Sequence, residues 1–271
     1  MLVRGADVEW RKGLDRLLRG LKEYPRDIEG PTYGVVKGFA DGEARRYALG
    51  RLEDAVDAVL EVEDNSFDIG AYRTVAETIS EDTICFLNGY SQPLASGWFG
   101  KLAASHAAPG VGAVAATGSF ESLKPAYPEF PSFPNPHLRS NAFMVDRRLF
   151  LEIASGFTFR TKRDAFGFES GRKSFTSQLR ERGLATLLVG RDARGYDIDA
   201  WPSSGVFRLG AQANLLVADN QTRAYAAMPW EEKRDVASLT WGPLIDYERI
   251  SLALSVKCPA RPTRGPAARD V

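Results

Sequence analysis

Short apolar segments alternate with amphipathic segments over most of the chain, and this alternation restricts the fold more than any other feature. The expected strands of the first half are 33–36, 57–64, 83–87 and 111–118. The segments between them have helical periodicity, and residues 8–22 carry four leucines at i, i+3, i+4 and i+7. Strands that alternate with helices predict βαβ units. We therefore expect an α/β fold with a mostly parallel central sheet flanked by helices.

A proline-rich segment, 124–136, interrupts this alternation. It has five prolines among 13 residues, which excludes regular strand pairing and predicts an ordered loop or lid. Beyond it we expect a strand at 141–145, a helix at 170–183 that ends at Gly183, a strand at 184–189, and two helical pieces within 207–240. The predicted organisation is one domain with halves 1–123 and 124–206, a helical extension over 207–256, and a disordered tail over 257–271.

Composition and charge exclude several classes of function. The chain has 35 Lys and Arg against 35 Asp and Glu, so it lacks the basic excess of a nucleic-acid-binding protein. Its two cysteines and two histidines are not spaced as zinc ligands. No apolar run approaches the roughly 18 residues that span a bilayer, and the N-terminus lacks the apolar region of a signal peptide. We expect a cytoplasmic protein with small-molecule or protein partners. Peripheral membrane association and the oligomeric state remain open.

Polar or glycine-rich residues follow each expected strand of the first half. They are 3–5, 37–38, 64–68, 88–91 and 117–119. In an open parallel sheet, ligands bind outside the carboxyl ends of the strands, so these residues predict a binding site along one edge. Asp68 and Ser91 also stand where helix N-caps are expected. Capping explains each of them singly, but it does not explain why five loops are polar together.

The order of these segments resembles the nucleotide-binding half of the family 2 glycosyltransferases of the GT-A fold. The resemblance covers about residues 2–190 and is carried by "LVRG", "GVVKGF" and "DNSFDIGAYRTVAETISEDTICFLNGYSQPLASGWFGKL". In that family an Asn-x-Gly-like segment precedes an Asp-x-Asp metal site by about two dozen residues, and a Pro and a Trp-Leu helix follow. Here the distance from Asn65 to Asn88 is 88 − 65 = 23 positions. The resemblance implies a GT-A-like (Rossmann-like) fold and inverting transfer of a sugar from a nucleotide sugar to a glycan acceptor, in bacterial surface polysaccharide synthesis.

Two departures from the family remove negative charge. Lys37 replaces the Asp that binds the nucleobase, and Asn88-Gly89-Tyr90 replaces Asp-x-Asp. Hard divalent cations prefer carboxylate oxygens, so Mg²⁺ or Mn²⁺ is disfavoured and no metal ligand is assigned. One interpretation is that basic side chains neutralise the leaving diphosphate. The alternative is a catalytically inactive GT-A-fold module that binds a sugar or a protein.

The resemblance also assigns roles to individual residues. Glu169, in "KRDAFGFESGRKSFTSQLRERGL", matches the family's acidic residue that deprotonates the acceptor hydroxyl, and Ser170 replaces the neighbouring Asp. A glutamate beside a helix start is also favoured by the helix macrodipole alone. The expected donor-binding residues are Arg4, Lys37, Asp68, Arg73, Asn88, Tyr90 and Ser91. The expected acceptor-binding residues are Arg139, Asn141 and Trp201, although a tryptophan at this position could equally pack in the core.

The expected first strand is short. Met1, Leu2 and Val3 precede Arg4, whereas a strand of about five or six residues is expected before the nucleotide-contacting turn. We expect either a truncated first strand or a natural start upstream of Met1.

Overall fold

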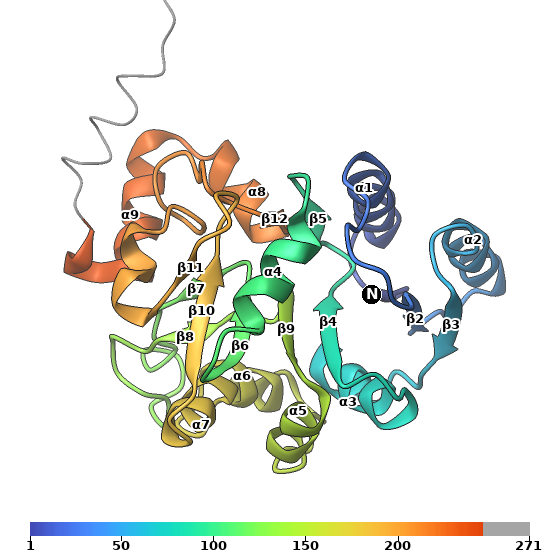
Figure 1. Ribbon diagram of the computed structural model, residues 1–271, viewed down its shortest axis with the longest axis horizontal. Coiled ribbons are helices and arrows are strands. Elements are labelled where there is room, and N and C mark those ends of the chain that lie inside the picture. Colours follow the sequence, from blue (N-terminus) through green and yellow to red (C-terminus); the bar gives the residue numbers. More distant parts are fainter. Residues whose placement is uncertain (246–271) are drawn as a thin grey trace, which may run out of the picture.

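The computed structural model describes residues 1–245, and these residues form an α/β fold in which mostly parallel central strands are flanked by helices (Figure 1). The predicted tail at 257–271 and the end of the predicted helical extension lie outside the described residues. The elements of the first half are β1 (Leu2–Arg4), α1 (Trp10–Glu23), β2 (Tyr33–Lys37), α2 (Gly42–Leu52), β3 (Ala58–Glu61), α3 (Asp68–Thr78), β4 (Thr83–Leu87), β5 (Gln92–Pro93), α4 (Trp98–His106), β6 (Val111–Ala115) and β7 (Gly118–Ser119). Those of the second half are β8 (His137–Leu138), β9 (Ala142–Asp146), α5 (Arg147–Ala154), α6 (Lys162–Ser170), α7 (Phe175–Glu181), β10 (Ala185–Val189), β11 (Gly195–Tyr196), the 3₁₀ helix η1 (Ile198–Ser203), β12 (Val217–Ala218), α8 (Asn220–Ala227), α9 (Trp230–Trp241) and the 3₁₀ helix η2 (Gly242–Leu244).

The central strands form two hydrogen-bonded groups. Strands β1, β2 and β3 form a parallel group in the order β1-β2-β3. The second group has the order β11-β10-β6-β9-β4, in which β10 is parallel to β6 and β9 is antiparallel to both of its neighbours. Because β9 reverses direction between them, β4, β6 and β10 run the same way. Their carboxyl ends therefore share one edge with the start of β9.

Side chains alternate between the two faces of these strands, as the period of two requires. On β4, Phe86 joins a large core with α3, α5, α6 and α7, whereas Leu87 joins a second core with Trp98 and Leu102 of α4. The leucine stripe of α1 covers the second face, where Leu14 and Leu17 are buried. None of the helices in residues 1–245 is long and apolar enough to cross a membrane.

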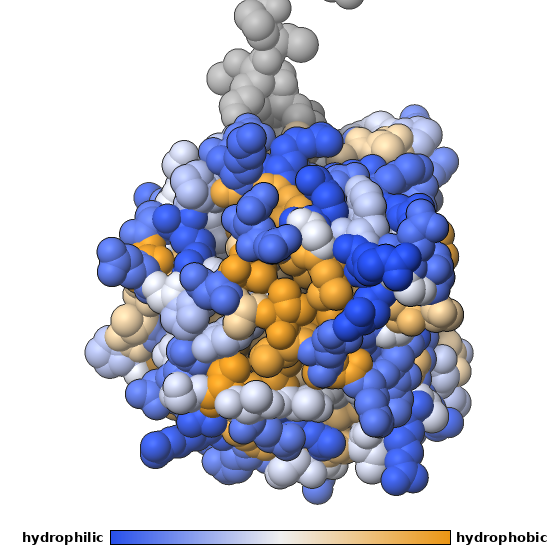
Figure 2. Space-filling model, turned by 90° about the vertical axis from the view of Figure 1, so that its right-hand side faces the viewer, coloured by the Kyte–Doolittle hydropathy of each residue, from blue (hydrophilic) through white to orange (hydrophobic). Residues whose placement is uncertain are grey.

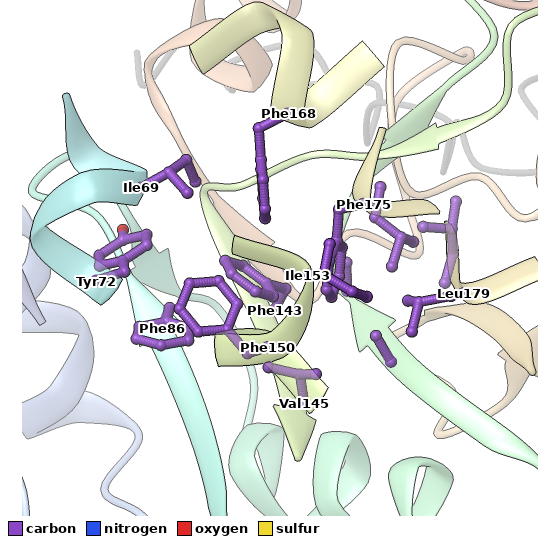
Figure 3. Packing of buried hydrophobic residues seen from close by; sticks show 14 of the residues in the cluster. Ile69, Tyr72, Phe86, Phe143, Val145, Phe150, Ile153, Phe168, Phe175 and Leu179 are labelled. Carbon is purple, nitrogen blue, oxygen red and sulfur yellow. The ribbon is translucent and has the colours of Figure 1, made fainter. Parts of the chain in front are cut away.

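Aromatic rings fill the first core and fix the position of α6 (Figure 3). Phe86 packs on Phe150 with ring centroids 4.8 Å apart, and Phe168 of α6 stacks on Phe175 of α7 with centroids 5.4 Å apart. Phe168 is buried and directly precedes Glu169 in the chain. The core thus holds the last turn of α6, and with it Glu169, against the sheet.

The predicted strands at 83–87 and 184–189 are confirmed to within one residue, and the predicted helix at 170–183 is confirmed over Phe175–Glu181 with its end at Gly183, but it begins five residues later than expected. Residues 162–181 form two helices, because a capping box between Thr161 and Asp164 starts α6 and Gly171 ends it. A Cβ on Gly171 would lie 2.5 Å from the carbonyl oxygen of Gly167, so this sharp break requires glycine. Within 207–240, helices occur from residue 220 onward, broken at Pro229 as expected, and 207–219 contains the strand β12 instead.

Candidate functional site

Two of the polar loops predicted from the sequence, 88–91 and 117–119, converge on the start of β9. The backbone N–H of Asn88, after β4, donates to the carbonyl oxygen of Asn141 at the start of β9 (3.0 Å). The hydroxyl of Thr117, after β6, donates to Asn141 Oδ1 (2.6 Å), and Arg139 Nη1 donates to the same hydroxyl (3.3 Å). Loops that lie far apart in the sequence therefore form one buried polar network, as expected from the topology.

Glu169 lies in the last turn of α6, not beside a helix start. The macrodipole is negative at that end of a helix, so it disfavours a carboxylate and cannot account for this residue. The hydroxyl of Ser140, just before β9, donates to Glu169 Oε2 (3.0 Å). Desolvation raises the pKa of Glu169, and this effect outweighs the opposing charge of Arg139 and the hydrogen bond from Ser140. Glu169 is thus a carboxylate with increased proton affinity, which suits a general base.

Arg4 and Lys37 both pair with Asp64, a carboxylate that is not among the site residues expected from the sequence. Arg4 makes a bidentate contact with Asp64, from Nε at 2.8 Å and from Nη2 at 2.9 Å, and it also contacts Asp7 (3.1 Å). The ammonium of Lys37 has no exposed surface and lies 3.2 Å from Asp64. It also donates to the carbonyl of Ser66. Both cations therefore hold the β3–α3 loop, and their charge is offset by Asp64 and Asp7.

The polar side chains of the Asn88-Gly89-Tyr90 turn already have hydrogen-bond partners within the protein. Asn88 Oδ1 accepts from the backbone N–H of Tyr90 (3.1 Å) and from the hydroxyl of Ser91 (3.0 Å). The Tyr90 hydroxyl donates to the carbonyl of Val8 (2.7 Å), and Ser91 is fully buried. Ser91 thus stabilises the turn and does not cap α4, whose N-cap is Gly97.

The donor set at this turn does not fit a resident divalent cation. It offers an amide oxygen that is already engaged and a phenol, whereas Mg²⁺ and Mn²⁺ prefer carboxylates. Within residues 1–245, no three His, Cys, Asp or Glu side chains are grouped so that they could hold a metal ion.

Asp68 and Arg73, both on α3, have different surroundings. Asp68 is the first residue of α3 and makes no capping hydrogen bond. Desolvation, with smaller contributions from the charges of Asp7 and Glu169, raises its pKa to about 6 although Lys37 and Arg4 oppose the shift. Arg73 donates to the carbonyl of Phe157 (3.0 Å) and lies over the ring of Phe159. Asp68 thus belongs electrostatically to the site, while Arg73 is engaged by the loop that precedes α6.

The three expected acceptor-binding residues also differ. Arg139 is 11% exposed, pairs with Asp219 (2.8 Å) and lies over the ring of Phe207. Asn141 is buried, and its Nδ2 has no hydrogen-bond partner among the described residues. Trp201 is fully buried, donates to the carbonyl of Tyr196 (2.9 Å) and packs against Phe120. The expectation that Trp201 stacks on a sugar is therefore wrong, because neither ring face is accessible.

Two further site residues come from the segment 215–225, for which the sequence indicates nothing beyond capping or a loop. Asp219 caps α8, accepting from Thr222 N–H (2.8 Å), and pairs with Arg139. Arg223, one turn into α8, donates through Nη2 to the carbonyl of Tyr90 (2.9 Å). Its Nη1 is buried without a hydrogen-bond partner in the described part of the chain. Arg223 thus places a guanidinium directly at the Asn-Gly-Tyr turn.

Comparison with known proteins gives similarity at the level of structure. No protein-family model matches the chain, and no curated protein matches it. A mannosyltransferase from Pyrobaculum calidifontis, solved with GDP-mannose and Mn²⁺, is 15% identical with a TM-score of 0.47, over 95% of this chain and 75% of that chain. The glycosyltransferase GlyE of Streptococcus pneumoniae is 11% identical with a TM-score of 0.43, over 96% of this chain and 65% of that chain. A putative glucose-1-phosphate thymidylyltransferase from Bacillus anthracis is 10% identical with a TM-score of 0.45, over 87% and 93%.

Proposed function

We propose that the chain is an inverting glycosyltransferase that moves a sugar from a nucleotide-sugar donor to a hydroxyl of a glycan acceptor. The proposed setting is bacterial surface polysaccharide synthesis in the cytoplasm. The observation that carries the proposal is Glu169: a partly buried carboxylate with a raised pKa, at the sheet edge, at the helix end that disfavours it electrostatically. A group maintained at such a cost to stability is a candidate for function.

In the proposed mechanism Glu169 accepts the proton of the acceptor hydroxyl as that oxygen attacks the anomeric carbon. The bond between this carbon and the diphosphate oxygen breaks on the opposite face, and its electron pair stays on the leaving oxygen. Ser140, which donates to Glu169 Oε2, orients the carboxylate. Proton transfer of this kind contributes on the order of 10²–10⁴-fold to the rate.

Arg223 is the proposed cation for the leaving diphosphate. It lies at the Tyr90 carbonyl, and its buried Nη1 has no hydrogen-bond partner among residues 1–245. The other basic side chains of the site are less available, because Arg4 and Lys37 contact Asp64, and Arg139 pairs with Asp219. A guanidinium can neutralise developing phosphate charge without a metal ion. We therefore propose metal-independent transfer, with Arg139 and Asn141 on the acceptor side.

A panel of nucleotide sugars tests the proposal. We expect one donor to raise the melting temperature of the protein to the same extent in EDTA and in Mn²⁺, and to release its nucleoside diphosphate when a glycan acceptor is added. If no donor shifts the melting temperature under either condition, the transferase proposal is wrong.

A catalytically inactive module that binds a sugar or a protein is the second candidate. It is favoured by the engagement of the expected donor-binding groups within the protein: the side chains of Asn88, Tyr90 and Ser91 already have hydrogen-bond partners, and Asp64 offsets the charges of Arg4 and Lys37. Donor binding without turnover of any acceptor would select this candidate over the first.

A further inference from the structure

The Asn-Gly-Tyr turn after β4 lies between two helices that are far apart in the sequence. In Figure 1, the strand β5, which follows the turn, lies between α1 and the segment formed by β12 and α8. An added Cβ on Gly13 of α1 would be 2.5 Å from the Gly89 carbonyl oxygen. One on Gly20 would be 2.9 Å from the side chain of Gln92. Glycines at these two positions therefore allow α1 to pack directly against the turn and β5.

Arg16 of α1 and Arg223 of α8 both lie at this turn. Arg16 comes three residues after Gly13 and four before Gly20, so it shares the face of α1 that packs against the turn. Arg223 donates through Nη2 to the Tyr90 carbonyl oxygen (2.9 Å). Burial lowers the pKa of Arg223, and the positive charge of Arg16 lowers it further. The two guanidiniums are therefore close enough to repel each other.

Neither guanidinium has a carboxylate of its own. Asp219 attracts Arg223 but forms its ion pair with Arg139 (2.8 Å). The charge of Glu9 interacts with Arg16, but the Glu9 side chain is 53% exposed, so water screens this attraction. Among residues 1–245, Arg16 makes no hydrogen bond or ion pair, and the buried Nη1 of Arg223 has no hydrogen-bond partner. Both cations are thus available to a ligand.

The resulting excess of positive charge is local. The chain as a whole has 35 basic and 35 acidic side chains. Figure 2 shows one side of the molecule, where polar side chains surround an apolar middle. At the turn, by contrast, two like charges and an unpartnered buried donor lie beside one short stretch of backbone. Neighbouring like charges and an unpaired buried donor both reduce stability, and an anion bound between them removes both costs.

Two guanidiniums fit a diphosphate better than a single phosphate. The diphosphate of a nucleotide sugar carries one negative charge on each phosphate, so two cations balance it. Guanidiniums also match the geometry of phosphate oxygens, to which they donate two parallel hydrogen bonds. A donor with one phosphate would leave one of the two guanidiniums without a partner.

We propose that Arg16 and Arg223 form a clamp for the diphosphate of the donor, with one phosphate on each guanidinium, and that this clamp selects nucleoside-diphosphate sugars over nucleoside-monophosphate sugars. The inference rests on the proposed function for the source of the diphosphate. It adds Arg16, a residue that neither the sequence motifs nor the proposed mechanism uses.

The first test is binding of pyrophosphate, with orthophosphate for comparison, to the full-length protein in EDTA by titration calorimetry. We expect pyrophosphate to bind at least ten-fold more tightly than orthophosphate. Arg16→Gln should weaken pyrophosphate binding about ten-fold or more, as expected for loss of a charge-assisted hydrogen bond. Arg11→Gln is the matched control, because it removes the same charge from the same helix, where Arg11 lies over the ring of Trp10. Equal effects of the two substitutions, or no preference for pyrophosphate, would overturn the proposal.

Thermal unfolding separates ligand binding from a structural role of Arg16. In buffer without phosphate, Arg16→Gln should raise the melting temperature, because it removes a like charge from beside Arg223. Pyrophosphate should raise the melting temperature of the wild type and leave that of the variant unchanged. A variant that melts below the wild type in the absence of ligand would show that Arg16 stabilises the fold, and would contradict the clamp.

Because pyrophosphate binding and sugar transfer are measured separately, the two proposals can fail separately. If the protein turns over a donor but Arg16→Gln binds pyrophosphate as the wild type does, the clamp is wrong and the transfer stands. If pyrophosphate binding depends on Arg16 but no donor is turned over, the transfer is wrong and the clamp stands as a diphosphate site.

Discussion

Replacing Asp219 with Asn removes one charge from the site and leaves its shape intact. The Asp219 and Arg139 side chains are 1% and 11% exposed, and their charged atoms are 2.8 Å apart. Asparagine can still accept from Thr222 N–H, so the cap of α8 is retained. What is lost is the partner of a buried guanidinium. Breaking such a pair costs about 3–5 kcal/mol of unfolding free energy. At about 2–4 °C per kcal/mol for a chain of this size, the melting temperature should fall by about 6–20 °C.

The assay is urea-induced unfolding of wild type and Asp219→Asn at several pH values. Burial raises the pKa of Asp219, but the charge of Arg139 and the bonds from Thr222 outweigh it, so the folded-state pKa is lowered. The stabilisation is therefore present above the ordinary pKa of Asp and is lost as the pH falls through the lowered value. We expect the two proteins to become equally stable in acid.

Asp15→Asn is the matched control for this experiment. Its pair with Arg51 has nearly the same length, 2.9 Å, but the two side chains are 40% and 46% exposed. Such surface pairs contribute about 0–1 kcal/mol. If Asp219→Asn loses no more stability at neutral pH than Asp15→Asn, the account of a buried ion pair holding α8 to the site is refuted.

Two further predictions concern His137 and Arg223. Desolvation lowers the pKa of buried His137 from 6.5 to about 4, so the unfolded chain binds a proton at a higher pH than the folded chain does. The free energy of unfolding should therefore decrease as the pH is lowered from 6.5 to 4. His137→Gln should make this decrease smaller in urea unfolding. Arg223→Gln should weaken binding of a nucleoside diphosphate about ten-fold or more by calorimetry, as expected for loss of a charge-assisted hydrogen bond. Arg163→Gln, which removes an exposed partner of Glu129, should leave that affinity unchanged, and equal effects of the two substitutions would argue against the role of Arg223.

The sequence predicts the elements of the fold well where periodicity is strong. Strand β4 is predicted without error because an apolar, partly β-branched run is bounded by polar residues on both sides. The helix expected at 170–183 begins five residues later, at Phe175, because two local signals set the helix boundaries in this segment. These are the capping box at Thr161 and the glycine at 171, which together place a helix before residue 170 and a break after it.

The sequence indicates part of the candidate site. The contacts that it does not indicate join residues far apart in the chain. Glu169 and the convergence of the polar loops follow from the motif and from the strand order. The pairing of Arg4 with Asp64, across 60 residues, has no local sequence signal. The same is true of Arg223, which lies 133 residues from the Tyr90 carbonyl that it contacts. Trp201 shows the converse: an aromatic residue in a polar stretch is compatible with a surface platform, yet the apolar area gained on burial favours the core.

Turnover by Glu169→Gln tests the central claim most directly. Glutamine can still accept from Ser140, so the fold and donor binding should be preserved. With the donor identified by thermal shift, and in the presence of EDTA, we predict that kcat falls about 10²–10⁴-fold while donor Kd is unchanged. In the wild type, kcat/KM should rise with pH through a value above the ordinary Glu pKa, because desolvation raises the pKa of Glu169. Full turnover by the Glu169→Gln variant would contradict the assignment of Glu169 as the base.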